Sequence, residues 1–181
     1  MNFRRIIFGI FGNLLILLSI NFASSYFIRG DIDDIKPQIN DKNSEEQIIL
    51  EKLILAVEKY SHIPYRYGGR SEKGVDCSGF VCLVFKNFFN MNLPQGSRNQ
   101  IHLGKDIPEV DLKAGDLLFF RMGRNIGHVG IYLSNGYFVS AESHKNKIGI
   151  SHLDSEYWRK RYVSARRLTI DTEYSAQTGT K

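Results

Sequence analysis

Hydrophobic and polar positions divide the chain into an apolar start, a polar connector and a patterned remainder. No residue from Ile6 to Ile28 is charged, and Arg4 and Arg5 precede this stretch. A positive start, an apolar centre and small residues near Ala23 are typical of a secretory signal peptide. The 23 uncharged residues are also long enough to cross a bilayer as an uncleaved anchor. We therefore assign residues 1–28 to a signal peptide or a membrane anchor, and both interpretations export the remainder.

The connector and the helix after it differ in their pattern. Residues 29–43 are polar and acidic, contain Pro37 and show little periodicity, which predicts a linker. Apolar residues then recur at helical spacing from Ile48 to Val57, and Ser44 with Gln47 fits a capping box. We expect a helix over about 45–60, a folded domain over 44–170 and a flexible tail over 171–181.

The rest of the domain is expected to contain one more helix and then several strands. A turn-rich loop from Pro64 to Asp76 leads to an apolar helix from Cys77 to Asn90. Strand patterns follow at residues 116–120, 128–133, 137–141, 149–153 and 162–168. Helices that precede strands predict an α+β domain with an antiparallel sheet. Asn135-Gly136 between two apolar runs predicts a hairpin.

Composition restricts the class of protein. The chain has 181 residues, of which 43% are hydrophobic and 24% charged, so it suits one globular domain with a tail. Two cysteines exclude a disulfide scaffold and a zinc site built from cysteine alone. The sequence shows no cluster of metal ligands and no phosphate-binding loop. We therefore expect no metal and no cofactor.

Charge is distributed unevenly. Residues 1–30 carry a net +3, residues 31–48 carry −4, and residues 49–181 carry +6. A basic domain raises nucleic-acid binding as an alternative, but a basic surface alone is weak support and export argues against it. We expect no nucleic-acid partner, and we interpret the arginines and lysine at 159–161 and 166–167 as a solvated face.

Cys77 begins the second predicted helix, behind Asp76 as a plausible N-cap. The positive end of a helix favours a thiolate, which is the nucleophilic form of cysteine. The free N–H groups of the first turn, including those of Cys77 and Ser78, can stabilise an oxyanion. The alternative is that Cys77 is one more small buried residue. We place Cys82 in the core, and the helical spacing of the two cysteines disfavours a disulfide between them.

A nucleophilic thiol needs a base, and the chain has five histidines. His128 begins an apolar strand directly after Gly127, where a strand edge can hold an imidazole rigidly while its tip stays accessible. From the residues alone, a surface histidine without a role remains the alternative.

Several sequence blocks resemble the NlpC-type cysteine peptidases of bacterial cell-wall peptidoglycan, in particular the Spr-type murein endopeptidases. They span nearly the whole domain in the order of the family, and the Asp-Cys-Ser-Gly and His-Val-Gly-Ile-Tyr blocks are highly specific. The blocks are Tyr-Arg-Tyr-Gly-Gly at 65–69, Gly-Val-Asp-Cys-Ser-Gly-Phe-Val at 74–81, Leu-Pro at 93–94, Gly-Asp-Leu-Leu-Phe-Phe at 115–120, Gly-His-Val-Gly-Ile-Tyr at 127–132, Tyr-Trp at 157–158, Arg-Tyr at 161–162 and Ala-Arg-Arg at 165–167.

The resemblance implies a papain-like core in which Cys77 is the nucleophile and His128 the base. It also implies that Tyr65 directs its hydroxyl towards the thiol and, with Ser78, supports the oxyanion site. The implied activity is an endopeptidase that cleaves stem-peptide or cross-link amides of peptidoglycan through an acyl-enzyme, in or facing the periplasm, as a monomer. A catalytically weak cell-wall binding domain and a related amidase or acyltransferase are the alternatives.

The sequence departs from the family at the residue that orients the base. The family usually places a third polar residue, often histidine, twelve positions after the base, and here that position is Ser140. A three-residue hairpin loop at 134–136 would set Glu142 opposite His128 with Ser140 diagonal on the same face, whereas a two-residue loop would put Ala141 there instead. We therefore expect Ser140, or Glu142 in its place, to orient His128; water or no third group is the alternative. A second departure is Gln95-Gly96, where the Spr-type pattern usually has arginine.

Overall fold

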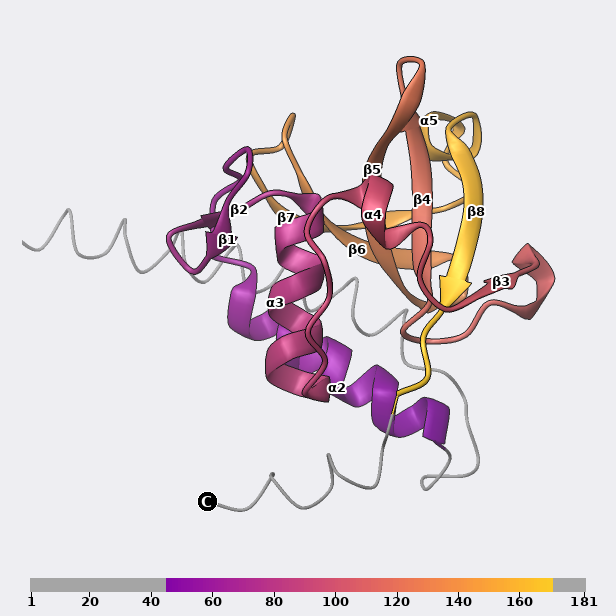
Figure 1. Ribbon diagram of the computed structural model, residues 1–181, viewed down its shortest axis with the longest axis horizontal. Coiled ribbons are helices and arrows are strands. Elements are labelled where there is room, and N and C mark those ends of the chain that lie inside the picture. Colours follow the sequence, from indigo (N-terminus) through magenta and orange to yellow (C-terminus); the bar gives the residue numbers. More distant parts are fainter. Residues whose placement is uncertain (1–44, 171–181) are drawn as a thin grey trace, which may run out of the picture. The chain divides into compact units, whose positions relative to one another are not determined.

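The computed structural model describes residues 45–170 (Figure 1). The predicted signal or anchor at 1–28, the linker at 29–43, the Ser44 cap and the tail at 171–181 lie outside the described residues. Within the described range, no helix combines the length and apolar character that crossing a membrane requires.

Two helices carry most of the helical structure. α2 spans Glu45–Tyr60 and α3 spans Cys77–Phe89, close to the two helices that the apolar periodicity predicts. Two single-turn helices, α4 at Ser97–Gln100 and α5 at Glu156–Arg159, and a 3-10 turn η1 at Glu109–Asp111 were not expected. One turn is too short to show helical periodicity, so the sequence pattern gives no signal for them.

The strands form a hairpin and a larger sheet. The hairpin pairs β1 (Arg70–Ser71) with β2 (Gly74–Val75). The six-stranded antiparallel sheet has the order β3-β8-β4-β5-β6-β7, so the predicted α+β class is confirmed. Its strands are β3 (Lys105–Ile107), β4 (Leu117–Met122), β5 (Asn125–Ser134), β6 (Tyr137–Glu142), β7 (Lys147–His152) and β8 (Tyr162–Arg167).

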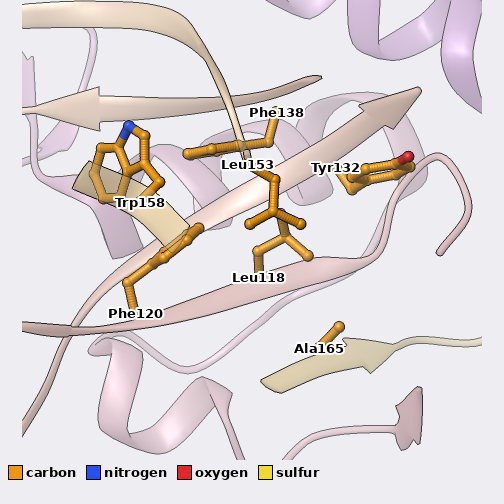
Figure 2. Close-up of a cluster of buried hydrophobic side chains, with 7 residues drawn as sticks. All are labelled: Leu118, Phe120, Tyr132, Phe138, Leu153, Trp158 and Ala165. Atoms are coloured by element: carbon orange, nitrogen blue, oxygen red, sulfur yellow. The ribbon is translucent and has the colours of Figure 1, made fainter. Parts of the chain in front are cut away.

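The sheet buries both of its faces. On one side α3 contacts β5 and β6, and α2 lies next to α3 (Figure 1). Because neighbouring residues of a strand point to opposite faces, the alternate residues of β4, β5 and β6 form a second apolar layer. Figure 2 shows this layer, to which α5 contributes Trp158; its members are Leu118, Phe120, Tyr132, Phe138, Leu153, Trp158 and Ala165.

The hairpin between β5 and β6 combines the short loop of one predicted alternative with the strand register of the other. Its loop has two residues, because Ser134 pairs with Tyr137 and both Asn135 (φ 49°) and Gly136 (φ 81°) have positive φ. An irregularity between Tyr132 and Ser134 then shifts the pairing, so that Ile131 faces Val139. This is the register that a three-residue loop predicts. The observed β5–β6 pairs end at Ile131–Val139, before either His128 or Glu142.

Arg167, one of the arginines expected on a solvated face, is 32% exposed and also forms a specific ion pair. Its guanidinium donates to both carboxylate oxygens of Asp116, at 2.8 and 2.7 Å, and Asp116 is 1% exposed. The pKa of Arg167 is raised because Asp116 accepts these hydrogen bonds. The pair ties β8 to the loop before β4.

Candidate active site

Asp76 organises the start of α3. Its Oδ1 accepts hydrogen bonds from the Gly79 N–H at 2.7 Å and the Ser78 hydroxyl at 2.8 Å, and its Oδ2 accepts from the Gly68 N–H at 3.0 Å. The bond from Gly79 caps the helix, as the sequence predicts for Asp76. The third ties the glycine-rich loop to the same carboxylate, so Asp76 fixes both the helix start and the loop beside it.

Glycine at position 79 lets this loop lie directly on the helix. A Cβ atom there would come within 2.0 Å of the carbonyl oxygen of Gly69. Since no side chain can occupy that space, the loop and the first turn of α3 approach at backbone distance. The helix start that carries Cys77 is thereby held from two sides.

The Cys77 thiol is buried where helix α3 meets strand β5. Its Sγ donates to the carbonyl oxygen of Gly127 at 4.0 Å, and the side chain is 8% exposed. Burial raises the pKa of the thiol to about 11, with Asp76 adding to the rise, while the N–H groups of Val129, Ser78 and Cys77 itself oppose it. The thiol is therefore protonated at neutral pH and needs a base to react.

His128 lies on β5 between Gly127 and Val129, whose carbonyl oxygen and N–H contact the Cys77 thiol. Its side chain is 6% exposed, and burial, with a smaller contribution from His144, lowers its pKa to about 4. A neutral imidazole can accept the proton that Cys77 must lose. In the described part of the chain its Nε2 is buried without a hydrogen-bond partner.

The two candidates for the orienting residue lie in different surroundings. Ser140 is fully buried, and its Oγ has no hydrogen-bond partner among the described residues. Glu142 is 1% exposed, and its Oε1 accepts hydrogen bonds from Ser151 at 2.8 Å and Lys145 at 3.2 Å. Its Oε2 lies 3.3 Å from His144 Nε2 and 3.1 Å from Lys145 Nζ. The carboxylate is thus already engaged by other groups.

A cleft of about 640 Å³ opens beside Cys77. Its walls are formed by the loop at 65–68, the first turn of α3, the segment 95–99 and Ile126-Gly127. Tyr65 lies in this cleft, and burial and then Cys77 raise the pKa of its phenol. Gln95 donates through Nε2 to the carbonyl oxygen of Gly68 at 3.3 Å, and Arg98 is the basic side chain among the described residues that line the cleft. Tyr65, Cys77 and Ser78 therefore share one concave surface.

Gln100 is a residue of this site that the sequence reasoning missed. It is fully buried, and its Nε2 donates to the carbonyl oxygens of Ser78 at 3.2 Å and Pro94 at 2.9 Å. It thereby fastens one wall of the cleft to α3. A glutamine in a single-turn helix has no sequence pattern that would reveal this contact.

Cys82 differs from the expectation that placed it in the core. It is a half-buried free thiol, 3.4 Å from both the Leu93 carbonyl oxygen and the Gln100 Nε2. Its place on α3 faces the segment after the helix rather than the sheet. Cys77 is also free, so no disulfide joins the two.

Within 45–170, no three side chains of histidine, cysteine, aspartate or glutamate come together in a group that could hold a metal ion.

The thiol at a helix start, the neighbouring histidine strand and the cleft agree with the family resemblance. The chain matches the model of the NlpC/P60 family over residues 62–167. It belongs to the NlpC/P60 family. The match runs from the loop before the cleft to the end of β8, so the NlpC/P60 region includes Cys77, His128 and the whole sheet.

Individual relatives agree with this assignment. The chain is 43% identical to the murein DD-endopeptidase MepS/murein LD-carboxypeptidase of Escherichia coli K12, over 59% of this chain and 56% of that protein. It is 37% identical to the probable endopeptidase NlpC of the same organism, over 73% and 86%. The chain thus spans little more than half the length of MepS.

A solved structure supports the fold. An NlpC/P60 family protein from Bacillus cereus superimposes with a TM-score of 0.61 and 27% identity, covering 65% of this chain and 39% of that protein. The NlpC-type α+β fold, with helices on an antiparallel sheet, is therefore confirmed.

Proposed function

We propose that this protein is a peptidoglycan hydrolase, a cysteine endopeptidase that cleaves stem-peptide or cross-link amide bonds of the bacterial cell wall. The observation that carries the proposal is the position of the Cys77 thiol, at the start of α3, in a cleft and alongside the backbone that flanks His128. The relative named as a murein DD-endopeptidase supports the substrate class.

In the proposed reaction, Cys77 and His128 act together. His128 takes the thiol proton as the Cys77 Sγ forms a bond to the amide carbon, and the carbonyl oxygen becomes an oxyanion. The N–H groups of the first turn of α3 and the Tyr65 hydroxyl stabilise this charge. The C–N bond then breaks, and His128 returns the proton to the leaving amine. Water, deprotonated by His128, hydrolyses the thioester and regenerates the thiol.

The pKa shifts define the resting state of the pair. Burial raises the pKa of Cys77 to about 11 and lowers that of His128 to about 4, so both groups are neutral at neutral pH. The proton therefore moves during the reaction rather than before it. Activity that requires neutral His128 should persist below the ordinary histidine pKa of 6.5 as the pH falls.

We further propose that Ser140, or Glu142 in its place, orients His128. The alternation of side chains along β5 and β6, starting from the Tyr132–Phe138 pair, supports this proposal. The test compares turnover of Ser140→Ala and Glu142→Gln with the unaltered chain at neutral pH, and we expect a loss on the order of tenfold in whichever residue acts. Unchanged turnover in both variants would show that neither one orients the imidazole.

Residues 1–28 are proposed to export the domain, either as a cleaved signal or as an anchor that tethers it facing the periplasm. Arg4, Arg5 and the uncharged span after them support this assignment. We propose the domain as a monomer, joined to residues 1–28 by the linker at 29–43.

The activity is tested by incubating the full chain with purified peptidoglycan and identifying the products by mass. We expect fragments cleaved within the peptides, which disappear in Cys77→Ala and remain in Cys82→Ala, a matched thiol control outside the catalytic pair. Release of intact peptides from the sugar chain would favour an amidase. Binding to peptidoglycan without any product that depends on Cys77 would favour the cell-wall binding domain.

A further inference from the structure

We propose that Trp158 is the positioning residue of the catalytic imidazole, holding the His128 ring by stacking and stabilising its protonated form through the indole π face. The inference deepens the proposed function, since it rests on His128 being the base. It concerns a residue of α5 that lies 30 positions from His128 in the sequence and outside the lining of the cleft.

The ring contacts of His128 define its plane. The Trp158 ring lies 4.9 Å from the imidazole centroid at an interplanar angle of 25°, a stacked arrangement. Phe120 contacts the imidazole from β4, at 5.9 Å and 50°. In the described residues no hydrogen bond reaches Nε2, and the Ser140 hydroxyl has no partner either. Aromatic packing is therefore the interaction that the structure shows holding this ring.

Trp158 is itself held firmly, as a positioning residue must be. Its side chain is 5% exposed and lies 4.8 Å from Phe120, 5.3 Å from Phe138 and 4.9 Å from Tyr157 between ring centroids. Figure 2 shows Trp158 beside Phe120 and Phe138 at one end of the apolar cluster. The next residue, Arg159, forms ion pairs with Glu109 and Asp154, which anchor the short helix.

The stack also favours the protonated, positively charged form of the His128 imidazole. When His128 takes the thiol proton it becomes a buried cation, and an indole face attracts a cation. The ionisable group that acts on the imidazole is His144, which in turn pairs with Glu142. The Glu142 carboxylate is engaged by Lys145, and Ser140 carries no charge. The π face of Trp158 therefore lies against the ring on which positive charge develops.

The first test uses the fact that the sequence contains one tryptophan. Growth on mono-, di- and trifluorinated tryptophan weakens the π face of Trp158 in steps with nearly unchanged shape. The readout is the rate of Cys77 alkylation by iodoacetamide at neutral pH in a Cys82→Ala background, which requires no peptidoglycan. We expect a stepwise fall of roughly two- to tenfold across the series. A constant rate would overturn the proposal.

Substitutions provide the second test. Trp158→Phe should keep most of the alkylation rate, whereas Trp158→Leu should lose on the order of tenfold or more because the ring is no longer held. Phe138→Leu is the matched control, since it removes a ring of the same cluster that contacts Trp158. Equal losses in Trp158→Leu and Phe138→Leu would assign Trp158 a packing role only.

An NMR titration of His128 in Cys77→Ala separates positioning from packing. Trp158→Leu should lower the pKa of His128 relative to the same protein with Trp158, because the π face no longer favours the cation. An unchanged pKa would contradict the electrostatic part of the proposal. Alkylation that follows the expected series in a protein without activity on peptidoglycan would instead count against the proposed function alone.

Discussion

Two clusters of buried polar groups lie on the same sheet and differ in how their hydrogen bonds are satisfied. Around Asp116, both carboxylate oxygens accept from Arg167, and Oδ2 also accepts from the Lys113 N–H at 2.9 Å. Around His128, the Nε2 atom and the Ser140 hydroxyl are buried without partners in the described part of the chain. The first cluster joins β8 to the loop before β4, and the second includes a residue of β5 whose neighbours contact the Cys77 thiol through their backbone.

The difference separates a structural role from a reactive one. A buried polar group without a partner costs stability, so folded proteins rarely retain one without a reason. In the Asp116 cluster both carboxylate oxygens already accept hydrogen bonds, so neither is available to a substrate. Burial lowers the pKa of His128, and a neutral imidazole can accept a proton as a base must. The proposed function assigns the unsatisfied groups, His128 and Ser140, to the reactive cluster.

The largest effect should come from His128→Gln. We expect turnover on peptidoglycan to fall on the order of 10³-fold, because no other group takes the thiol proton. The free energy of unfolding should fall by only about 1 kcal/mol, because the ring contacts with Trp158 and Phe120 are lost. Turnover and urea unfolding measure the two quantities. Retained turnover would remove His128 from the reaction.

For Asp116→Asn we expect a larger loss of stability and no change in the reactivity of the Cys77 thiol. Removing the charge that Arg167 binds should lower the free energy of unfolding by about 3 kcal/mol, the cost of breaking a buried ion pair. The alkylation rate of Cys77 in the folded variant should equal that of the unaltered chain. A variant that kept its stability but lost thiol reactivity would reverse the roles given to the two clusters.

The smallest effect concerns pH. Folding lowers the pKa of His128 from 6.5 to about 4, so the unfolded chain binds a proton that the folded chain does not. This contribution to stability is present above the unfolded value and is lost as the pH falls from about 6.5 towards 4. Between about pH 7 and about pH 5 we expect a loss of about 2 kcal/mol that His128→Gln lacks. Parallel urea unfolding of both proteins at the two pH values measures it, and equal losses would show that His128 titrates normally.

The sequence predicted the parts of the site that are local. Cys77 behind an N-capping Asp76 can be read from adjacent residues, because a helix start is set by interactions within one turn. The positions of α2, α3 and β4 to β8 follow from apolar periodicity. The register of β5 and β6 was only partly accessible, because it depends on an irregularity after Tyr132 that the turn residues do not announce.

The remaining features depend on contacts between residues far apart in the chain. The Arg167 pair with Asp116 spans 51 positions, and Gln100 reaches Ser78 across 22. No sequence pattern distinguishes an arginine in a strand, or a glutamine in a short helix, that makes such a contact from one that is exposed to solvent. The sequence also does not reveal that Trp158 stacks on His128, because an apolar residue of the core can pack against many different rings.

The sequence by itself determined the family, the α+β class and the two residues that are candidates for the chemistry, since these depend on local motifs and periodicity. Only the tertiary structure decided that Cys77 lies in a cleft beside the backbone around His128, that Glu142 is already engaged, and that Trp158 stacks on the imidazole. The physical reason is that burial, desolvation and ring stacking arise between elements brought together by folding, and they set the pKa and orientation of groups whose identity the sequence already shows.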